Sequence, residues 1–333
     1  MGKFLESEKP RQAQFKMTSQ YFSTAAKQPG VYKSHSYPFC LPSGSREENL
    51  FFEIRDPVLK YFAANEIKWH DAHDGKPSNH MCDSMVCGVN FLFPFFNKPE
   101  ALASLLRPIF PDLQIMLPIE DGQYVAMEWI GKENYLGEIK SPNRKRSRGA
   151  LFTSADAAVM FEHLDGRRQF VLIEWKYTEA YFSTPLHTAK SGTKRTDIYR
   201  HLYEADDCLL DKDLLPSYDD LFYEPFYQFM RQQFLANEME KAGELGADIV
   251  SLLHIAPEVN RDFKRITSPG LRDIAESATE VWGKLVKKPD RFISISTEEL
   301  FGNLDTSGNE ELSDWWNYIS SRYRWVKVRQ DEN

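Results

Sequence analysis

Two adjacent strand candidates lie within RSRGALFTSADAAVMFEHLDGRRQFVLIEWKYTEAY, residues 146–181. The apolar runs at 150–163 and 169–177 favour extended structure, and Leu164-Asp165-Gly166 separates them as a turn would. Side chains alternate between the two faces of a strand, so Glu174 and Lys176 share one face and Trp175 points to the other. The segment predicts a β-hairpin with an acid and a base on one face.

The loop of this hairpin decides whether Asp156 joins that face. A two-residue Asp165-Gly166 turn pairs residue 156 with residue 175, which puts Asp156 on the wrong face. A three-residue loop, Leu164 to Gly166 with Gly166 left-handed, pairs 156 with 174 instead. Glycine is the residue that such a loop favours, so the sequence permits the second register.

Asp156, Glu174 and Lys176 together suit metal-dependent hydrolysis. Two carboxylates placed close together repel each other, and hard oxygen ligands suit Mg²⁺ or Mn²⁺. The backbone carbonyl of Trp175 is a further candidate ligand, and Lys176 would orient the attacking water or stabilise charge at phosphorus. A partly exposed hairpin with ordinary surface charges is the alternative. However, the flanking runs 157–159 and 170–173 are apolar and place these charges inside strands that lead into a core.

The same residues resemble a known superfamily. The D…ExK hairpin resembles the PD-(D/E)XK nucleases, and four longer runs resemble a bacterial group of restriction-endonuclease-like proteins: NLFFEIRD (49–56), RGALFTSADAAV (148–159), LIEWKYTE (172–179) and YEPFYQFMRQQFLA (223–236). The resemblance covers most of residues 45–330. It implies Mg²⁺-dependent cleavage of DNA, with Asp156 and Glu174 as metal ligands and Lys176 as the catalytic lysine. Ala155 stands where the superfamily signature has proline.

The resemblance also implies an additional acid upstream of Asp156 and a glutamine on a following helix. Glu138 is the expected acid, with Glu128 and Glu53 as rivals; a solvated carboxylate at a strand end is the alternative. Gln228 is the expected glutamine. Gln232 lies four residues further on and so shares its helix face, and a solvent-facing pair is equally compatible with this spacing.

Two basic loops bracket the hairpin. Residues 140–148 hold five basic side chains and no acid, and residues 187–201 hold four Lys and Arg against one Asp. Loops at the strand ends are where phosphates would approach, so DNA is the expected partner, through loops 140–148 and 190–200. Solvated loops are the alternative. A homodimer is compatible with this interpretation.

A group of potential soft-metal ligands precedes the hairpin. It contains His70, His73, His80 and Cys82, but their spacing matches no familiar zinc finger and no CxxC pair accompanies them. A polar loop is the preferred interpretation of this segment.

The fold class expected for the chain is α/β, a restriction-endonuclease-like core with a central mixed β-sheet flanked by helices and with helical N-terminal and C-terminal additions. Residues 1–45 lack periodicity and predict a flexible N-terminal arm. A helical region at 46–122 would pack on the core, with helices at 49–62, from Asp83 or Ser84 to 93, and at 98–106. The nuclease core is expected at 123–260, with further strands at 124–130, 135–139 and 247–255 and helices at 199–210 and 224–240. Residues 261–333 predict an α/β extension of the same domain, with a helix at 268–286, a strand at 292–296 and a helix at 314–323.

Composition narrows the class of protein. The 333 residues are 42% hydrophobic and 14% aromatic, which supports a large core, and the net charge of −8 excludes a uniformly basic surface but not a local basic patch. No apolar run approaches the roughly 20 residues that span a bilayer, and the N-terminus lacks the apolar run of a signal peptide. Four cysteines without a CxxC pair indicate reduced thiols, so the expected location is the cytoplasm and no membrane partner is expected.

The primary hypothesis is therefore a metal-dependent DNA endonuclease, acting in restriction or host defence. A repair or recombination nuclease is one alternative. A catalytically silent DNA-binding module of the same fold is the other.

Overall fold

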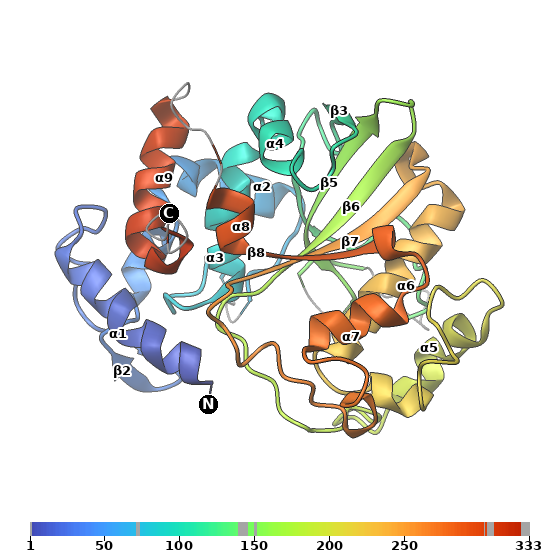
Figure 1. Ribbon diagram of the computed structural model, residues 1–333. Helices are drawn as coiled ribbons and strands as arrows, with labels where there is room; N and C mark the ends of the chain where they lie inside the picture. The colour runs from blue at the N-terminus through green and yellow to red at the C-terminus, as the bar shows by residue number, and fades with distance from the viewer. Residues whose placement is uncertain are drawn as a thin grey trace.

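A six-stranded mixed β-sheet forms the centre of the computed structural model, which describes residues 2–70, 74–138, 146–149, 152–302, 304 and 310–327 (Figure 1). Its strands are β3 (Leu113–Leu117), β4 (Ala126–Trp129), β5 (Ala155–His163), β6 (Arg168–Trp175), β7 (Ile249–Ala256) and β8 (Phe292–Ser296). The order is β3-β5-β6-β7-β8. Both β3 and β4 pair with the same edge of β5, β4 with its first half and β3 with its second half. The β3–β5, β4–β5 and β5–β6 pairs are antiparallel, whereas β6, β7 and β8 run parallel. The expected mixed sheet is confirmed.

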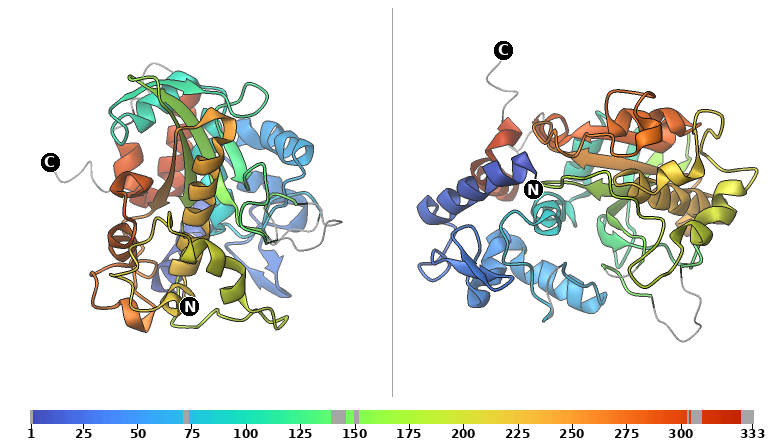
Figure 2. Two further views of the ribbon diagram at one scale, coloured as in Figure 1. Left: turned by 90° about the vertical axis from the view of Figure 1, so that its right-hand side faces the viewer. Right: turned by 90° about the horizontal axis from the view of Figure 1, so that it is seen from below.

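Helices cover both faces of this sheet (Figures 1 and 2). On one face α6 (Phe226–Ala242) runs along the strands and, with α5 (Arg195–Glu204) and α7 (Ala278–Leu285), closes one apolar core. The opposite face packs against a second core that is built from both ends of the chain. Its helices are α1 (Lys3–Thr18), α2 (Arg55–Ala64), α3 (Ser84–Leu92), α4 (Pro99–Leu106), α8 (Thr297–Gly302) and α9 (Glu310–Arg322).

The N-terminal segment is the largest correction to the sequence-based prediction. In place of a flexible arm, residues 3–18 form α1, and a short hairpin of β1 (Gly30–Tyr32) and β2 (His35–Tyr37) follows. Glu8, Gln12 and Lys16 recur every four residues on the buried face of α1. Because these three residues are polar, no apolar period marks the helix. Its partners come from distant segments: Gln12 Nε2, for example, donates to the hydroxyl oxygen of Tyr177 at 3.0 Å.

Several boundaries also differ from the prediction. The strand expected at 135–139 is a turn over residues 135–138, and Ile139 lies outside the described residues. The helix expected at 268–286 is a 3-10 turn at Pro269–Leu271 followed by α7, which Ser277 caps by accepting from Glu280 N. The helix expected from residue 49 begins at Arg55, and the first hairpin strand begins at Ala155. β3 lies before residue 123, the expected start of the core, and pairs with β5 in the sheet.

The register of the central hairpin follows the three-residue loop. Ala157 pairs with Ile173 and Glu162 with Arg168, which puts residue 156 opposite residue 174. Gly166 has a φ of +85°, and His163 N donates to Arg167 O at 2.8 Å across the closed end. The predicted left-handed glycine is confirmed, and with it the register that brings Asp156 to the face of Glu174.

Candidate active site

Three carboxylates lie side by side across three neighbouring strands. The β4–β5 pairs on either side of Glu128 place it opposite Asp156, and the β5–β6 register places Asp156 opposite Glu174. Alternation puts these side chains on the sheet face that α6 covers. Glu174 is only 1% exposed and Glu128 only 7%. The fold therefore concentrates like charge in a place where unpaired charge is costly.

Asp156 links the two strands of the hairpin. Its Oδ2 accepts a hydrogen bond from Trp175 N at 2.7 Å, just beyond the last ladder pair. Burial, and then the charge of Glu174, raise the pKa of Asp156 well above its usual range, although Lys176 opposes the shift. A bound cation would relieve this repulsion.

Glu174 has both carboxylate oxygens engaged. Lys176 Nζ donates to Oε1, and Gln232 Nε2, from α6, donates to Oε2. Burial by itself would lower the pKa of Lys176, but the charge of Glu174 and of other nearby acids outweighs it, so that pKa is raised and the ammonium is retained. The indole of Trp175 packs on the opposite sheet face against Phe91, and its carbonyl oxygen accepts from Ser84 Oγ at 3.4 Å.

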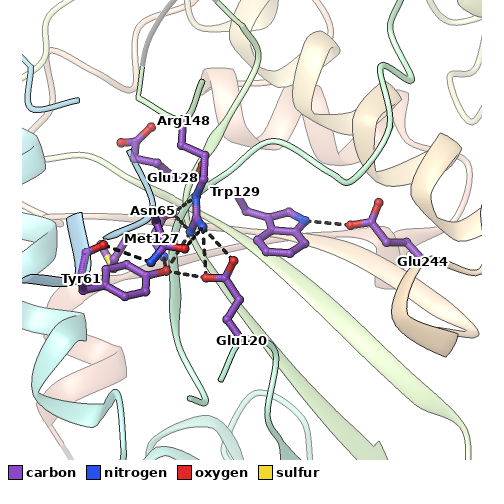
Figure 3. A network of polar contacts seen from close by, with 8 residues as sticks. All are labelled: Tyr61, Asn65, Glu120, Met127, Glu128, Trp129, Arg148 and Glu244. Carbon is purple, nitrogen blue, oxygen red and sulfur yellow. Dashed lines mark hydrogen bonds and ion pairs between the residues drawn. The ribbon is translucent and has the colours of Figure 1, made fainter. Parts of the chain in front are cut away.

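Glu128 is the third acid. Its Oε2 accepts from Ser154 Oγ at 2.8 Å, and burial, with the charge of Glu174 adding to it, raises its pKa to about 7. Its backbone is left-handed, with a φ of +51°. The buried guanidinium of Arg148 holds this stretch in place, since its Nε donates to the carbonyls of Met127 at 2.9 Å and Glu128 at 3.3 Å (Figure 3).

Two of the three acids, Glu128 and Asp156, line a cavity in the described part of the chain. It has a volume of about 810 Å³, and its lining includes Glu128, Asp156, Trp175 and Lys176. Residues 178–181 and α6 form one side, where Gln228 and Arg231 line it. The N-terminal hairpin and residues 80–85 form another. A ligand in this cavity would touch the core hairpin and the N-terminal segment together.

The structure separates the candidates for the additional acid. Glu138, the expected one, lies away from the cavity lining, where its carboxylate accepts from Thr153 N at 2.9 Å and from the Tyr199 hydroxyl at 2.8 Å. Glu53 is exposed on a 3-10 turn and is not in the lining either. The rival Glu128 is the one placed beside Asp156. A charged residue inside the apolar strand 125–129 was the sequence signal for it.

The two candidate glutamines also occupy different positions relative to the cavity. Gln228 lines the cavity, whereas Gln232 is buried and is the one that contacts Glu174. Gln232 Nε2 also lies 3.0 Å from Ser154 O, so it joins α6 to the strand segment that carries Asp156.

The described residues of the two basic loops do not line the cavity, although Gly149, next to the first loop, does. Residues 140–145 lie outside the described residues. Arg148 makes an ion pair with Glu120 at 2.8 Å (Figure 3). Arg146 Nη1 donates to Gly131 O at 3.1 Å. In the second loop Lys190 and Lys194 are exposed, and no residue of 190–200 belongs to the cavity lining.

Carboxylate oxygens are the main candidate metal donors at this site. Within the described ranges, no group of three or more His, Cys, Asp or Glu side chains has the arrangement of a ready-made metal site. His73, one of the four residues considered for zinc, lies outside the described residues. Mg²⁺ needs only one or two carboxylates and keeps several waters, so Asp156 and Glu174 suit it by chemistry.

Comparison with known proteins identifies one family. The family model described as "Restriction Endonuclease associating with ARP" matches residues 9–324. No curated protein and no solved structure gives a significant match. Of the helices in the described ranges, none combines the length and apolarity that crossing a membrane requires.

Proposed function

The chain belongs to the family of restriction endonucleases associating with ARP, and on this premise we propose that it is a PD-(D/E)XK-type DNA endonuclease that uses Mg²⁺ or Mn²⁺. The observation that carries the proposal is the register of the central hairpin, which sets Asp156 opposite Glu174 with Lys176 bonded to the latter. An acid pair with one retained ammonium is the chemistry that phosphodiester hydrolysis requires.

Asp156 and Glu174 would hold the metal ion, and the backbone carbonyl of Trp175 would add a ligand. The ion would polarise a phosphoryl oxygen and make a bound water more acidic. Lys176, kept protonated by its acidic surroundings, would orient that water and stabilise the charge that builds on the phosphate. Gln232 would fix the orientation of Glu174, because it donates to the oxygen that Lys176 does not use.

We assign the additional acidic role to Glu128, which replaces Glu138 as the candidate. It lies on the neighbouring strand beside Asp156, and burial, with the charge of Glu174 adding to it, raises its pKa to about 7. Restriction or host defence is the biological role that the family name favours. A cytoplasmic setting is consistent with the four cysteines, all free and buried.

The decisive experiment is cleavage of plasmid and of single-stranded circular DNA with Mg²⁺ or Mn²⁺, with the wild type compared to Asp156→Asn and Glu174→Gln. Both variants should lose cleavage by several orders of magnitude and regain none at higher metal concentration. The matched control is Asp165→Asn, which removes an exposed carboxylate from the same hairpin. Equal cleavage by wild type and Asp156→Asn refutes the mechanism, and metal-independent DNA binding without any cleavage would favour a silent binding module.

A further inference from the structure

Part of the cavity lining is aromatic. Tyr32, Tyr37, Phe39 and His80 all line it. Their rings form a continuous cluster: the His80 centroid lies 5.0 Å from that of Tyr32 and 5.0 Å from that of Phe39, and Tyr37 stacks on Phe39 at 5.0 Å. We call these four residues the aromatic wall. Tyr32 and Tyr37 are half-buried and both line the cavity.

Lysines interleave with these rings. Lys33 Nζ lies 4.9 Å from the Tyr32 ring centroid, and Lys9 Nζ lies 5.5 Å from that of Phe39. Both lysines belong to the cavity lining. Aromatic faces that stack on bases, next to cations that contact the backbone, are the combination by which proteins hold single-stranded nucleic acid.

The aromatic wall is fixed to the body of the protein. Asn79 Nδ2 donates to Val31 O at 2.9 Å and to Leu41 O at 2.8 Å, which ties β1 to the segment after β2. The buried ammonium of Lys16 donates to Cys40 O at 2.8 Å, and the backbone of Cys40 pairs with that of His80 in an isolated β-bridge. At Gly30 an added Cβ would lie 2.0 Å from Leu41 O, so the backbones are in direct contact there. A wall held in this way offers a preformed surface, which lowers the entropic cost of binding.

The depth of the acids restricts what can reach them. Glu174 and Glu128 are almost fully buried, and α6 covers their sheet face. A scissile phosphate must enter the cavity to share a metal ion with them. A volume of about 810 Å³ lies in the range that holds small ligands, so it accommodates a few nucleotides of one strand. One strand enters a cavity of this size more readily than two paired strands do.

We propose that the aromatic wall binds an unpaired nucleobase next to the scissile phosphate, so that the substrate is single-stranded DNA or DNA with unpaired nucleotides at the cut. This inference rests on the proposed nuclease function and specifies the substrate class of the same site. One or two bases stack on Tyr32 and Tyr37, Lys33 and Lys9 contact the adjoining phosphates, and the next phosphate is directed to Asp156 and Glu174.

Binding is measured by fluorescence anisotropy of the full chain in EDTA, with a labelled single strand of thymidines and a blunt duplex of equal length as probes. The wild type should bind the single strand at least about tenfold more tightly than the duplex. Loss of one stacking ring should weaken single-strand binding roughly 5- to 100-fold. Tyr32→Ala and Tyr37→Ala should show this loss, and Tyr32→Phe and Tyr37→Phe should retain binding. Phe52→Ala, which removes a 49% exposed ring away from the cavity, is the matched control.

A cleavage assay separates this inference from the proposed function. With Mg²⁺, a duplex containing an unpaired bubble should be cut in the bubble, and Tyr32→Ala should reduce that cutting. Asp156→Asn should abolish cutting and keep tyrosine-dependent binding. Tyrosine-dependent binding without cleavage by the wild type would overturn the nuclease assignment alone. Tight duplex binding, or full single-strand binding by both alanine variants with unchanged thermal stability, would overturn the aromatic wall as the base site.

Discussion

Replacement of Glu128 by glutamine should remove a pH-dependent loss of stability. The folded pKa of Glu128 is about 7 against an ordinary value of 4.5, because burial and the nearby Glu174 disfavour its charge. An acid with a raised folded pKa binds its proton more tightly in the native state. Its cost to stability is therefore absent below pH 4.5, grows as the pH rises towards 7, and is complete above that value.

The magnitude follows from the size of the shift. Each pKa unit corresponds to about 1.4 kcal/mol, so the wild type should lose about 3 kcal/mol of unfolding free energy relative to Glu128→Gln between about pH 4.5 and about pH 8. Glutamine keeps the shape and the ability to bond to Ser154 but does not titrate. Mg²⁺ should restore part of the wild-type stability at the higher pH, since a cation favours the ionised carboxylates.

The assay is urea unfolding of both proteins across this pH range, in EDTA and then with Mg²⁺. Met127→Leu, a neutral change in the same buried strand, serves as the control and should differ from wild type by the same amount at every pH. A difference between wild type and Glu128→Gln that stays constant with pH would refute the argument that Glu128 is held in a region unfavourable to its charge.

Two further predictions concern residues that position the site. Gln232→Ala should lower the rate of metal-dependent cleavage roughly 10- to 100-fold, because it removes the group that orients Glu174. The control is Gln233→Ala, which removes a buried side chain that donates to Arg291 O and should affect stability without that loss of rate. Equal cleavage rates for the two variants would contradict the assignment. Gly166→Ala should destabilise the chain by about 1–2 kcal/mol in thermal or urea unfolding, because an L side chain is strained at a φ of +85°. An unchanged midpoint would show that the loop adapts.

Local pattern was enough for the strands that carry the site. Apolar runs placed β6, β7 and β8 close to their observed positions. Asp83, one of the two residues expected at the start of a helix, caps α3 by accepting from Val86 N at 2.9 Å. Gly166 permitted the three-residue loop, and the structure shows the register that puts Asp156 on the face of Glu174. These features depend on a few neighbouring residues, so a single sequence reveals them.

Other features depend on partners far along the chain. The helix α1 was missed because Glu8, Gln12 and Lys16 interrupt the apolar residues of its buried side. Glu8 accepts from the hydroxyl of the distant Tyr177 at 2.6 Å as well as from Arg11 on the same helix. The choice between Glu138 and Glu128 was also not local. Both are acids next to short apolar runs, but one bonds to Thr153 and Tyr199, and the other faces Asp156 across a strand pair.

By itself, then, the sequence determined a hairpin with Glu174 and Lys176 on one face, because strand alternation is a local rule, and it permitted the glycine loop that adds Asp156 to that face. Only the tertiary structure decided what surrounds that face. The packing of α6 brings Gln232 to Glu174, and β4 brings Glu128 to Asp156. The N-terminal segment sets an aromatic wall along the cavity. Each of these contacts joins residues whose separation in sequence leaves no local trace, since their mutual placement follows from burying two apolar cores on one sheet.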